Sequence, residues 1–300
     1  MTDRTRTDCS PHRLRPAPRT SPADSLARAL RATRRTARRP RANRTHRPSR
    51  VGGTLSGPLE PSVMDTLRGL LARERRNDRL ALRDDRTGRE YDTHRLLTNA
   101  WKVSNLLHQC GVRAGHTVGL VGRTPEAVLA FLATASLGAV VRFDPSDEND
   151  LRAVVAPTDD LDRFDLPPGS TPVAYGAEPD DPGARYFERD VWSQNPTLAP
   201  SAVATDDPVL TADASFSHAD LLDGAERAVE RVGMDAGRTV AVRAPLALAG
   251  TVAAGLVAPL LTDATVVFPD SDTVADVAVS IDPAPEEAVC DPTTLLDDSP

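Results

Sequence analysis

The stretch Gly-Val-Arg-Ala-Gly-His-Thr-Val at residues 111–118 decides the fold, because a second version of it, Gly-Met-Asp-Ala-Gly-Arg-Thr-Val, follows at residues 233–240. The two copies start 122 residues apart. Each copy reads as a glycine that ends a helix, then a turn and the beginning of a strand. Two such units indicate two related α/β halves, and the alternative is a chance similarity between segments rich in Ala and Val.

The residues around the first copy carry alternating strand and helix signals. Asp-Arg-Thr-Gly at 85–88 is flanked by the segments 81–83 and 89–91, and this arrangement predicts a β-hairpin. Asp92 or Thr93 is placed to cap a helix, and Pro125 to open a second one. The elements predicted for this half are a hairpin over 81–83 and 89–91, a helix to about His108, a strand at 117–121, a helix over 126–137 and a strand at 139–143.

The same order of elements returns around the second copy. It comprises a helical stretch after Leu221, a strand at 239–242, a helix of small residues and a strand at 264–268. The connection between the halves is rich in Asp and Pro, and its apolar runs at 153–156 and 172–175 are predicted as strands. The predicted organisation is an N-terminal extension (1–63), a first α/β half (64–146), an Asp/Pro-rich connection with short strands (147–207) and a second, truncated α/β half (208–300).

Residues 244–261 form an uncharged segment that is long enough to raise the question of a membrane span. Prolines and glycines interrupt it at Pro245, Gly250, Gly255 and Pro259. A helix buried inside the protein is therefore the better interpretation, and we expect no membrane contact.

Charge is distributed unevenly along the chain, whose formal net charge is −7. Residues 1–63 carry +11, and the remaining 237 residues carry −18. Lys102 is the only lysine, and 32 Asp stand against 11 Glu. This composition suggests a salt-adapted cytoplasm, where a dense carboxylate surface is screened. It argues against nucleic acid as a partner of the acidic part, because phosphates repel carboxylates.

The basic residues 1–63 contain no periodic apolar segment, so we expect them to be disordered. No apolar run follows the arginine doublets, which argues against a secretory or twin-arginine signal and for a cytoplasmic location. Three interpretations stay open: translation that starts at Met64, a disordered basic tail, or an arm that binds nucleic acid.

Cysteine and histidine do not suggest a metal centre. Cys9, Cys110 and Cys290 are widely spaced, no Cys-x-x-Cys pair exists, and the six histidines are scattered. We therefore expect neither a disulfide framework nor a metal site, and we predict that Cys110 is a buried small hydrophobe.

Several ordered stretches resemble the AMP-forming acyl-CoA synthetases, which belong to the adenylate-forming ligase superfamily. They correspond to the family patterns T-Y-x-E-L, G-V-x-x-G-D-x-V-A-L, P-E-x-x-x-x-x-L-A, L-G-A-V-x-x-P-L-x-P, T-H-x-N-L and P-L-x-x-G-A-x-x-V. The resemblance covers about 80–146 and 207–270 and implies the two-halved large lobe of these ligases. In order, the stretches are Gly88-Arg-Glu-Tyr-Asp-Thr-His-Arg-Leu-Leu97, Gly111-Val-Arg-Ala-Gly-His-Thr-Val-Gly-Leu120, Thr124-Pro-Glu-Ala-Val-Leu-Ala-Phe-Leu-Ala133, Leu137-Gly-Ala-Val-Val-Arg-Phe-Asp-Pro145, Phe216-Ser-His-Ala-Asp-Leu-Leu222 and Ala258-Pro-Leu-Leu-Thr-Asp-Ala-Thr-Val-Val-Phe268.

The chain departs from the family where the family binds ATP. The resemblance implies a Ser/Thr/Gly-rich loop with a Pro-Lys-Gly end just before T-H-x-N-L, where backbone N–H groups and a lysine offset phosphate charge. Val209-Leu-Thr-Ala-Asp-Ala-Ser215 stands there instead, without Gly or Lys, and Asp213 would repel a triphosphate. Pro245-Leu-Ala-Leu replaces the family's P-L-x-H, and the sequence stops before the family's later motifs and small lobe.

The remaining candidate side chains have structural explanations. His218 is predicted to be a residue of the first helical turn whose side chain finds its hydrogen-bond partner locally, beside a Ser217 cap. Asp220 is predicted to complete a capping box with Ser217. Glu126 is predicted to favour a helix dipole, and Lys102 to lie on a solvated face.

We therefore predict a degenerate, non-catalytic acyl-CoA synthetase-like protein with no catalytic residue, no assignable cofactor-binding residue and no metal. The alternative is an AMP-forming carboxylate ligase that a separate polypeptide completes, and only then would ATP, Mg²⁺ and CoA be its cofactors. Its partners are otherwise unknown.

Overall fold

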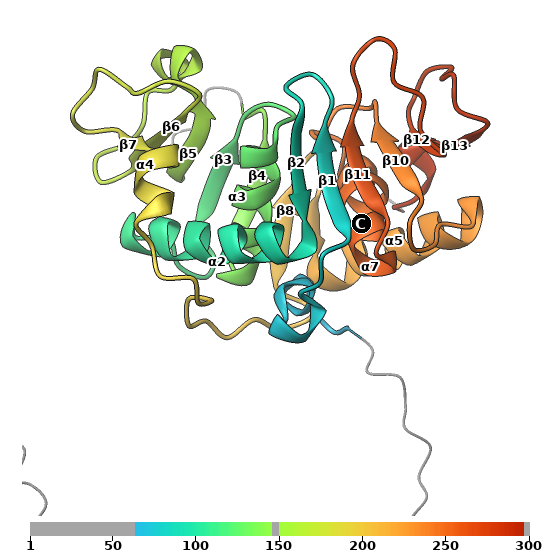
Figure 1. The fold of residues 1–300 in the computed structure, drawn as a ribbon. Helices are drawn as coiled ribbons and strands as arrows, with labels where there is room; N and C mark the ends of the chain where they lie inside the picture. Colours follow the sequence, from blue (N-terminus) through green and yellow to red (C-terminus); the bar gives the residue numbers. More distant parts are fainter. Residues whose placement is uncertain (1–63, 146–149, 297–300) are drawn as a thin grey trace, which may run out of the picture. The chain divides into compact units, whose positions relative to one another are not determined.

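The computed structural model describes residues 64–145 and 150–296, which belong to one compact unit. The predicted disorder of residues 1–63 concerns residues outside this range. Two sheets dominate the described part, with strand orders β7-β6-β5-β3-β4-β8-β9 and β13-β12-β10-β11-β1-β2 (Figure 1). The strands are β1 Leu80–Asp84, β2 Arg89–Asp92, β3 Thr117–Leu120, β4 Val140–Phe143, β5 Leu151–Pro157, β6 Thr171–Tyr175, β7 Arg185–Tyr186, β8 Pro208–Thr211, β9 Ser215–Ser217, β10 Thr239–Val242, β11 Thr265–Phe268, β12 Val277–Val279 and β13 Ala288–Cys290.

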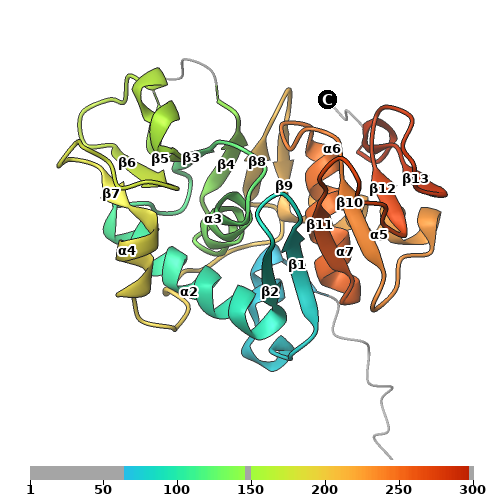
Figure 2. The same cartoon turned by 45° about the horizontal axis from the view of Figure 1, so that its top comes forward.

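The helices pack against these sheets and against one another, as the second view also shows (Figure 2). α2 packs along α3, which contacts β3, β4 and β5. The helices are α2 Thr93–Gln109, α3 Pro125–Ser136, α4 Phe187–Trp192, α5 His218–Val232, α6 Ala249–Val252 and α7 Ala258–Thr262, with a π-helical turn, η4, at Ala253–Val257 and 3-10 turns η1 Leu67–Leu71, η2 Arg73–Arg75, η3 Thr158–Arg163 and η5 Pro292–Thr294.

Each half contributes an antiparallel hairpin to the sheet of the other half. β1 pairs with β11 of the second half, where Leu82 lies opposite Val266. All neighbouring strands run parallel except the two hairpin pairs, β1–β2 and β8–β9. β8 pairs in turn with β4 of the first half, where Leu210 lies opposite Val141. The predicted α/β class with two similar halves is confirmed, and the exchanged hairpins join the halves through backbone hydrogen bonds.

The predicted helix starts are confirmed because their caps form. Asp92 accepts a hydrogen bond from the Arg95 N–H at 2.6 Å. Thr124 accepts one from the Ala127 N–H, and Pro125 occupies the first turn of α3. These bonds satisfy N–H groups that a helix start leaves without partners inside the helix.

The uncharged segment 244–261 is buried, as predicted, over α6, the π-helical turn and α7. Gly250 allows this segment to approach the backbone closely, since a Cβ atom there would lie 1.9 Å from the Pro292 carbonyl oxygen. Within residues 64–145 and 150–296, no helix is both long and apolar enough to cross a membrane.

Candidate functional site

The segment that replaces the phosphate-binding loop forms a tight hairpin. β8 and β9 are joined by Ala212, Asp213 and Ala214, and the Ala212 N–H donates to the Ala214 carbonyl at 2.9 Å. The Asp213 carboxylate is exposed at the turn and accepts from the Ala214 N–H at 3.2 Å. Because the Ala212 and Ala214 N–H groups are used inside the turn, this hairpin presents a negative charge and no open row of donors to a phosphate.

His218 begins α5 and is fully buried, but its partner is not local as predicted. Its Nδ1 accepts a hydrogen bond from the Leu67 N–H at 3.2 Å, across 151 positions of sequence. No described residue bonds to its buried Nε2. Burial lowers the pKa of His218 from 6.5 to about 4, although the nearby Asp207 carboxylate opposes the shift. The prediction of a local hydrogen-bond partner was therefore wrong, because the ring accepts from Leu67 in η1.

The Ser217 and Asp220 capping box is confirmed, with Ser217 Oγ accepting from the Asp220 N–H at 3.2 Å. Glu126 lies in the first turn of α3 as predicted, but it is also buried and forms an ion pair with Arg89. This pair links β2 to α3.

Lys102 is half-buried rather than fully solvated, since its Nζ donates to the Trp192 carbonyl at 3.3 Å. Its Nζ also lies 5.9 Å from the centre of the Trp192 ring. Lys102 therefore packs on α4.

A cleft of about 280 Å³ lies at the carboxyl ends of strands from both sheets. Parallel α/β sheets bind ligands preferentially at this edge, because the loops that follow the strands converge there. Its lining residues follow β3, β4 and β10 or lie in the β1–β2 turn: Arg86, Gly122, Arg123, Asp144, Arg243, Pro245 and Leu246. We call this the arginine cleft.

Main-chain carbonyls connect the three arginines of the cleft. The Arg86 guanidinium donates to the Arg123 carbonyl, and Arg123 Nη1 donates to the Arg243 carbonyl at 2.7 Å. Arg86 also lies against Asp84, with Nε 2.9 Å from Oδ1. The loops that leave the two sheets are therefore tied together by side chains that carry positive charge.

Arg243 is neutralised by Glu286, whose side chain is fully buried. Arg243 Nη2 lies 2.6 Å from Glu286 Oε1, and its Nε lies 3.0 Å from Oε2. Burial acts to raise the pKa of Glu286, but hydrogen bonds from Arg243 and the Ala275 N–H outweigh it and hold the pKa below its usual value. This bidentate pair fixes the β10 side of the cleft.

Gly122 and Asp144 form the β3–β4 side of the cleft. The Gly122 N–H donates to Asp144 Oδ1 at 3.1 Å. Gly122 has a φ of 87°, and a Cβ atom there would lie 2.7 Å from the Tyr175 hydroxyl, so the position favours glycine on both counts. Sequence reasoning missed this cleft, although an arginine soon after the strand in both repeat copies was an available signal.

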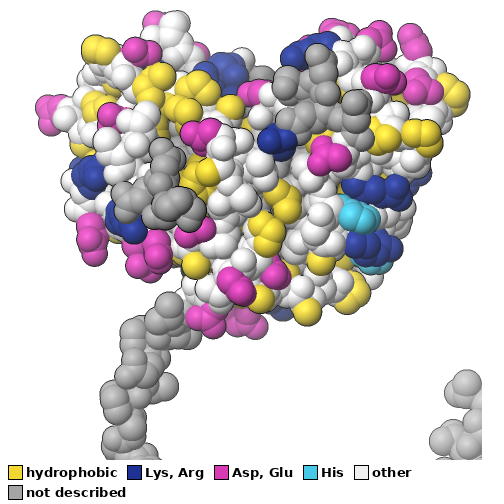
Figure 3. Space-filling model, turned by 180° about the vertical axis from the view of Figure 1, so that it is seen from behind, with side chains coloured by type: hydrophobic (Ala, Val, Ile, Leu, Met, Phe, Trp, Pro, Cys, Tyr) yellow, Lys and Arg dark blue, Asp and Glu magenta, His cyan; other side chains and the backbone are white. Residues whose placement is uncertain are grey.

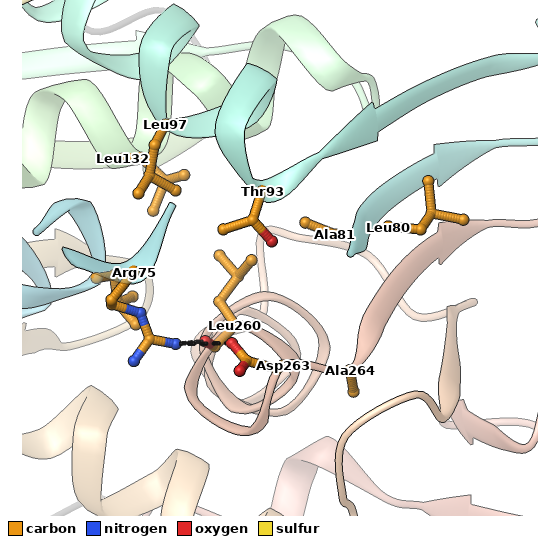
Figure 4. A pocket seen from close by; sticks show the side chains of 10 residues that line it. Arg75, Leu80, Ala81, Thr93, Leu97, Leu132, Leu260, Asp263 and Ala264 are labelled. Atoms are coloured by element: carbon orange, nitrogen blue, oxygen red, sulfur yellow. Dashed lines mark hydrogen bonds and ion pairs between the residues drawn. The ribbon is translucent and has the colours of Figure 1, made fainter. Parts of the chain in front are cut away.

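A second, water-sized cavity of about 10 Å³ lies between η2, α2, α3 and α7 (Figure 4). Arg75 spans it, donating to the Leu260 carbonyl and reaching Asp263 at 3.3 Å. Its volume suits one water molecule, so we regard it as a packing feature.

No cluster of His, Cys, Asp or Glu in the described part of the chain is arranged to hold a metal ion. Cys110 and Cys290 are free thiols, and burial raises the pKa of both. The burial predicted for Cys110 is confirmed.

No protein-family model and no curated protein sequence matches the chain. Solved structures do match. An anthranilate CoA ligase, AuaEII, in complex with anthranoyl-AMP superposes with a TM-score of 0.61 at 20% identity, covering 72% of this chain and 49% of that one. MatB from Rhodopseudomonas palustris gives a TM-score of 0.55 at 16% identity, covering 68% of this chain and 45% of that one.

A fatty acyl CoA synthetase of Mycobacterium tuberculosis gives a TM-score of 0.57 at 15% identity, covering 70% of this chain and 46% of that one. The chain thus spans about half the length of the structures it matches. The two sheets with their packed helices agree with the large lobe of such enzymes. The described part of this chain therefore has the fold of the adenylate-forming ligases.

Proposed function

We propose that this protein is a ligase-fold binding or regulatory protein that does not itself form acyl adenylates. The observation that carries the proposal is the hairpin at Ala212, Asp213 and Ala214. Acyl adenylation needs donors and cations around the phosphates of ATP, and loss of one such donor typically lowers a rate by about 10²–10³. In this hairpin the Ala212 and Ala214 N–H groups bond within the turn, and the exposed charge is negative.

The alternative is an AMP-forming ligase that acts together with a separate polypeptide. The observation that favours it is the match to about half the length of enzymes of this fold. In that case the second polypeptide would supply the phosphate-binding lysine, and ATP, Mg²⁺ and CoA would be required. We place either form in the cytoplasm, with no membrane partner and no nucleic acid at its acidic surface.

Calorimetric titration of the full chain with ATP and Mg²⁺ in molar KCl tests the proposal. We expect no dissociation constant tighter than about 1 mM, the weak end of the affinity scale. The Asp213→Asn variant serves as the matched comparison, because it removes the repulsive charge but supplies no donor row. It should bind ATP as weakly as the parent chain, whereas micromolar binding by the parent would refute the proposal.

A further inference from the structure

One arginine of the cleft, Arg123, has no ion-pair partner among the described residues. Arg86 has Asp84, and Arg243 has Glu286, but no carboxylate of the described residues lies within ion-pair distance of Arg123. Arg123 is half-buried, and burial together with Arg86 and Arg243 lowers its pKa, although the nearby Asp84 carboxylate opposes the shift. An anion that entered the cleft would offset this unfavourable charge.

The guanidinium of Arg123 is held in place but keeps donors to spare. Nη1 is anchored on the Arg243 carbonyl at 2.7 Å, while no described residue accepts from Nε or Nη2. Arginine presents its donors in a planar fork that matches the oxygens of phosphate and carboxylate. Arg123 is therefore oriented to receive an oxyanion without first having to be ordered.

Asp144 lines the same cleft and restricts which anion fits. Its Oδ1 accepts from the Gly122 N–H, and an ionised carboxylate can only accept further hydrogen bonds. An oxyanion that carries an O–H group can donate to Asp144, whereas a fully deprotonated oxyanion would face it with repulsion. At about 280 Å³ the cleft lies just under the 300–1,000 Å³ range of ordinary ligand sites, so its occupant is small.

We propose that the arginine cleft binds inorganic hydrogen phosphate, with Arg123 donating to its oxygens and Asp144 accepting from its O–H group. The β4–β8 pairing places the cleft and the β8–β9 hairpin at the same edge of the sheet, but no residue of the hairpin lines the cleft. The proposal does not depend on whether the protein adenylates a carboxylate. Sulfate has the same shape but no proton near neutral pH, and the methyl phosphate dianion lacks the O–H group as well. The cleft should therefore discriminate against both.

The experiment is calorimetric titration of the full chain with phosphate, sulfate and methyl phosphate at pH 8 and constant ionic strength. Phosphate should bind at least about tenfold more tightly than either competitor, because a site built around a hydroxyl rejects an analogue that lacks it. This comparison uses only the parent protein, so it does not depend on the folding of a variant. Equal binding of phosphate and sulfate, or no binding of phosphate, would overturn the proposal.

Two variants test the residues proposed to bind phosphate, and a third variant serves as the control. Arg123→Gln should weaken phosphate binding at least about tenfold. Asp144→Asn keeps the oxygen that accepts from Gly122 and adds an N–H donor, so it should bind sulfate as well as phosphate. Arg79→Gln removes an exposed arginine at the amino end of β1 and should leave both affinities unchanged. If Asp144→Asn still rejects sulfate, the assigned role of Asp144 is wrong.

Discussion

At the scale of single residues, His218 makes the fold sensitive to acid. Its folded pKa is about 4, against 6.5 for an ordinary histidine, because burial disfavours the charged ring. Below pH 6.5 the unfolded chain takes up a proton that the folded chain refuses, so stability falls as the pH drops from 6.5 to about 4. The upper limit of this loss is about 3 kcal/mol.

His218→Asn tests this directly, because the asparagine oxygen can replace Nδ1 as acceptor for the Leu67 N–H. Between pH 7 and pH 4.5 the variant should lose less stability than the parent in urea unfolding. His94→Asn, at an exposed histidine, is the control and should keep the parent's pH dependence. If the free energy of unfolding falls equally with pH in the parent and in His218→Asn, His218 does not cause the acid sensitivity.

At the scale of elements, the close contact between α6 and η5 depends on Gly250. A methyl group at this position would collide with the backbone at Pro292, which cannot move aside as a flexible side chain can. Gly250→Ala should therefore destabilise the protein by about 1–3 kcal/mol, as overpacked cores generally do. Gly69→Ala is the control, since its added methyl group meets only the side chain of Met64, and its loss of stability should be clearly smaller. Equal urea unfolding midpoints for Gly250→Ala and the parent chain would contradict this account.

Local signals predicted most elements because they act over a few residues. Asp92 and Pro125 mark helix starts whose caps form within one turn, and the repeat at 111–118 and 233–240 aligns β3 with β10. The pairing of β1 with β11 depends instead on residues far apart in sequence, which no local signal specifies. For the same reason β8 and β9 were missed, because each is short and finds its support in β4.

The arginine cleft was missed for a related reason, although Arg123 and Arg243 each follow the strand of one repeat copy. Arg86, Arg123 and Arg243 are far apart in sequence, and each alone reads as an ordinary surface charge. Only the exchange of hairpins between the two sheets brings the β1–β2 turn next to the ends of β3 and β10. Likewise, His218 bonds to Leu67, which lies 151 positions away in the sequence, so the sequence near His218 does not specify this partner.

At the scale of the whole molecule, the large excess of carboxylates should make stability depend on salt. Residues 64–300 carry −18, and acidic side chains are spread over the face seen in Figure 3. Their mutual repulsion is relieved as the screening length shortens to about 3 Å near 1 M salt. Circular dichroism should therefore show a folded protein in molar KCl and loss of structure in dilute buffer. A spectrum that is the same under both conditions would contradict this account.

The measurement that tests the central claim most directly is carboxylate-dependent exchange of pyrophosphate into ATP. The full chain should be assayed in molar KCl with Mg²⁺ over a panel of carboxylates, alone and with any polypeptide encoded beside it. Because the β8–β9 hairpin offers no donor row and an exposed Asp213, the chain alone should give no exchange above a blank without protein. Exchange by the chain alone would contradict the non-catalytic account, and exchange only with the second polypeptide would establish the alternative of a ligase in two parts.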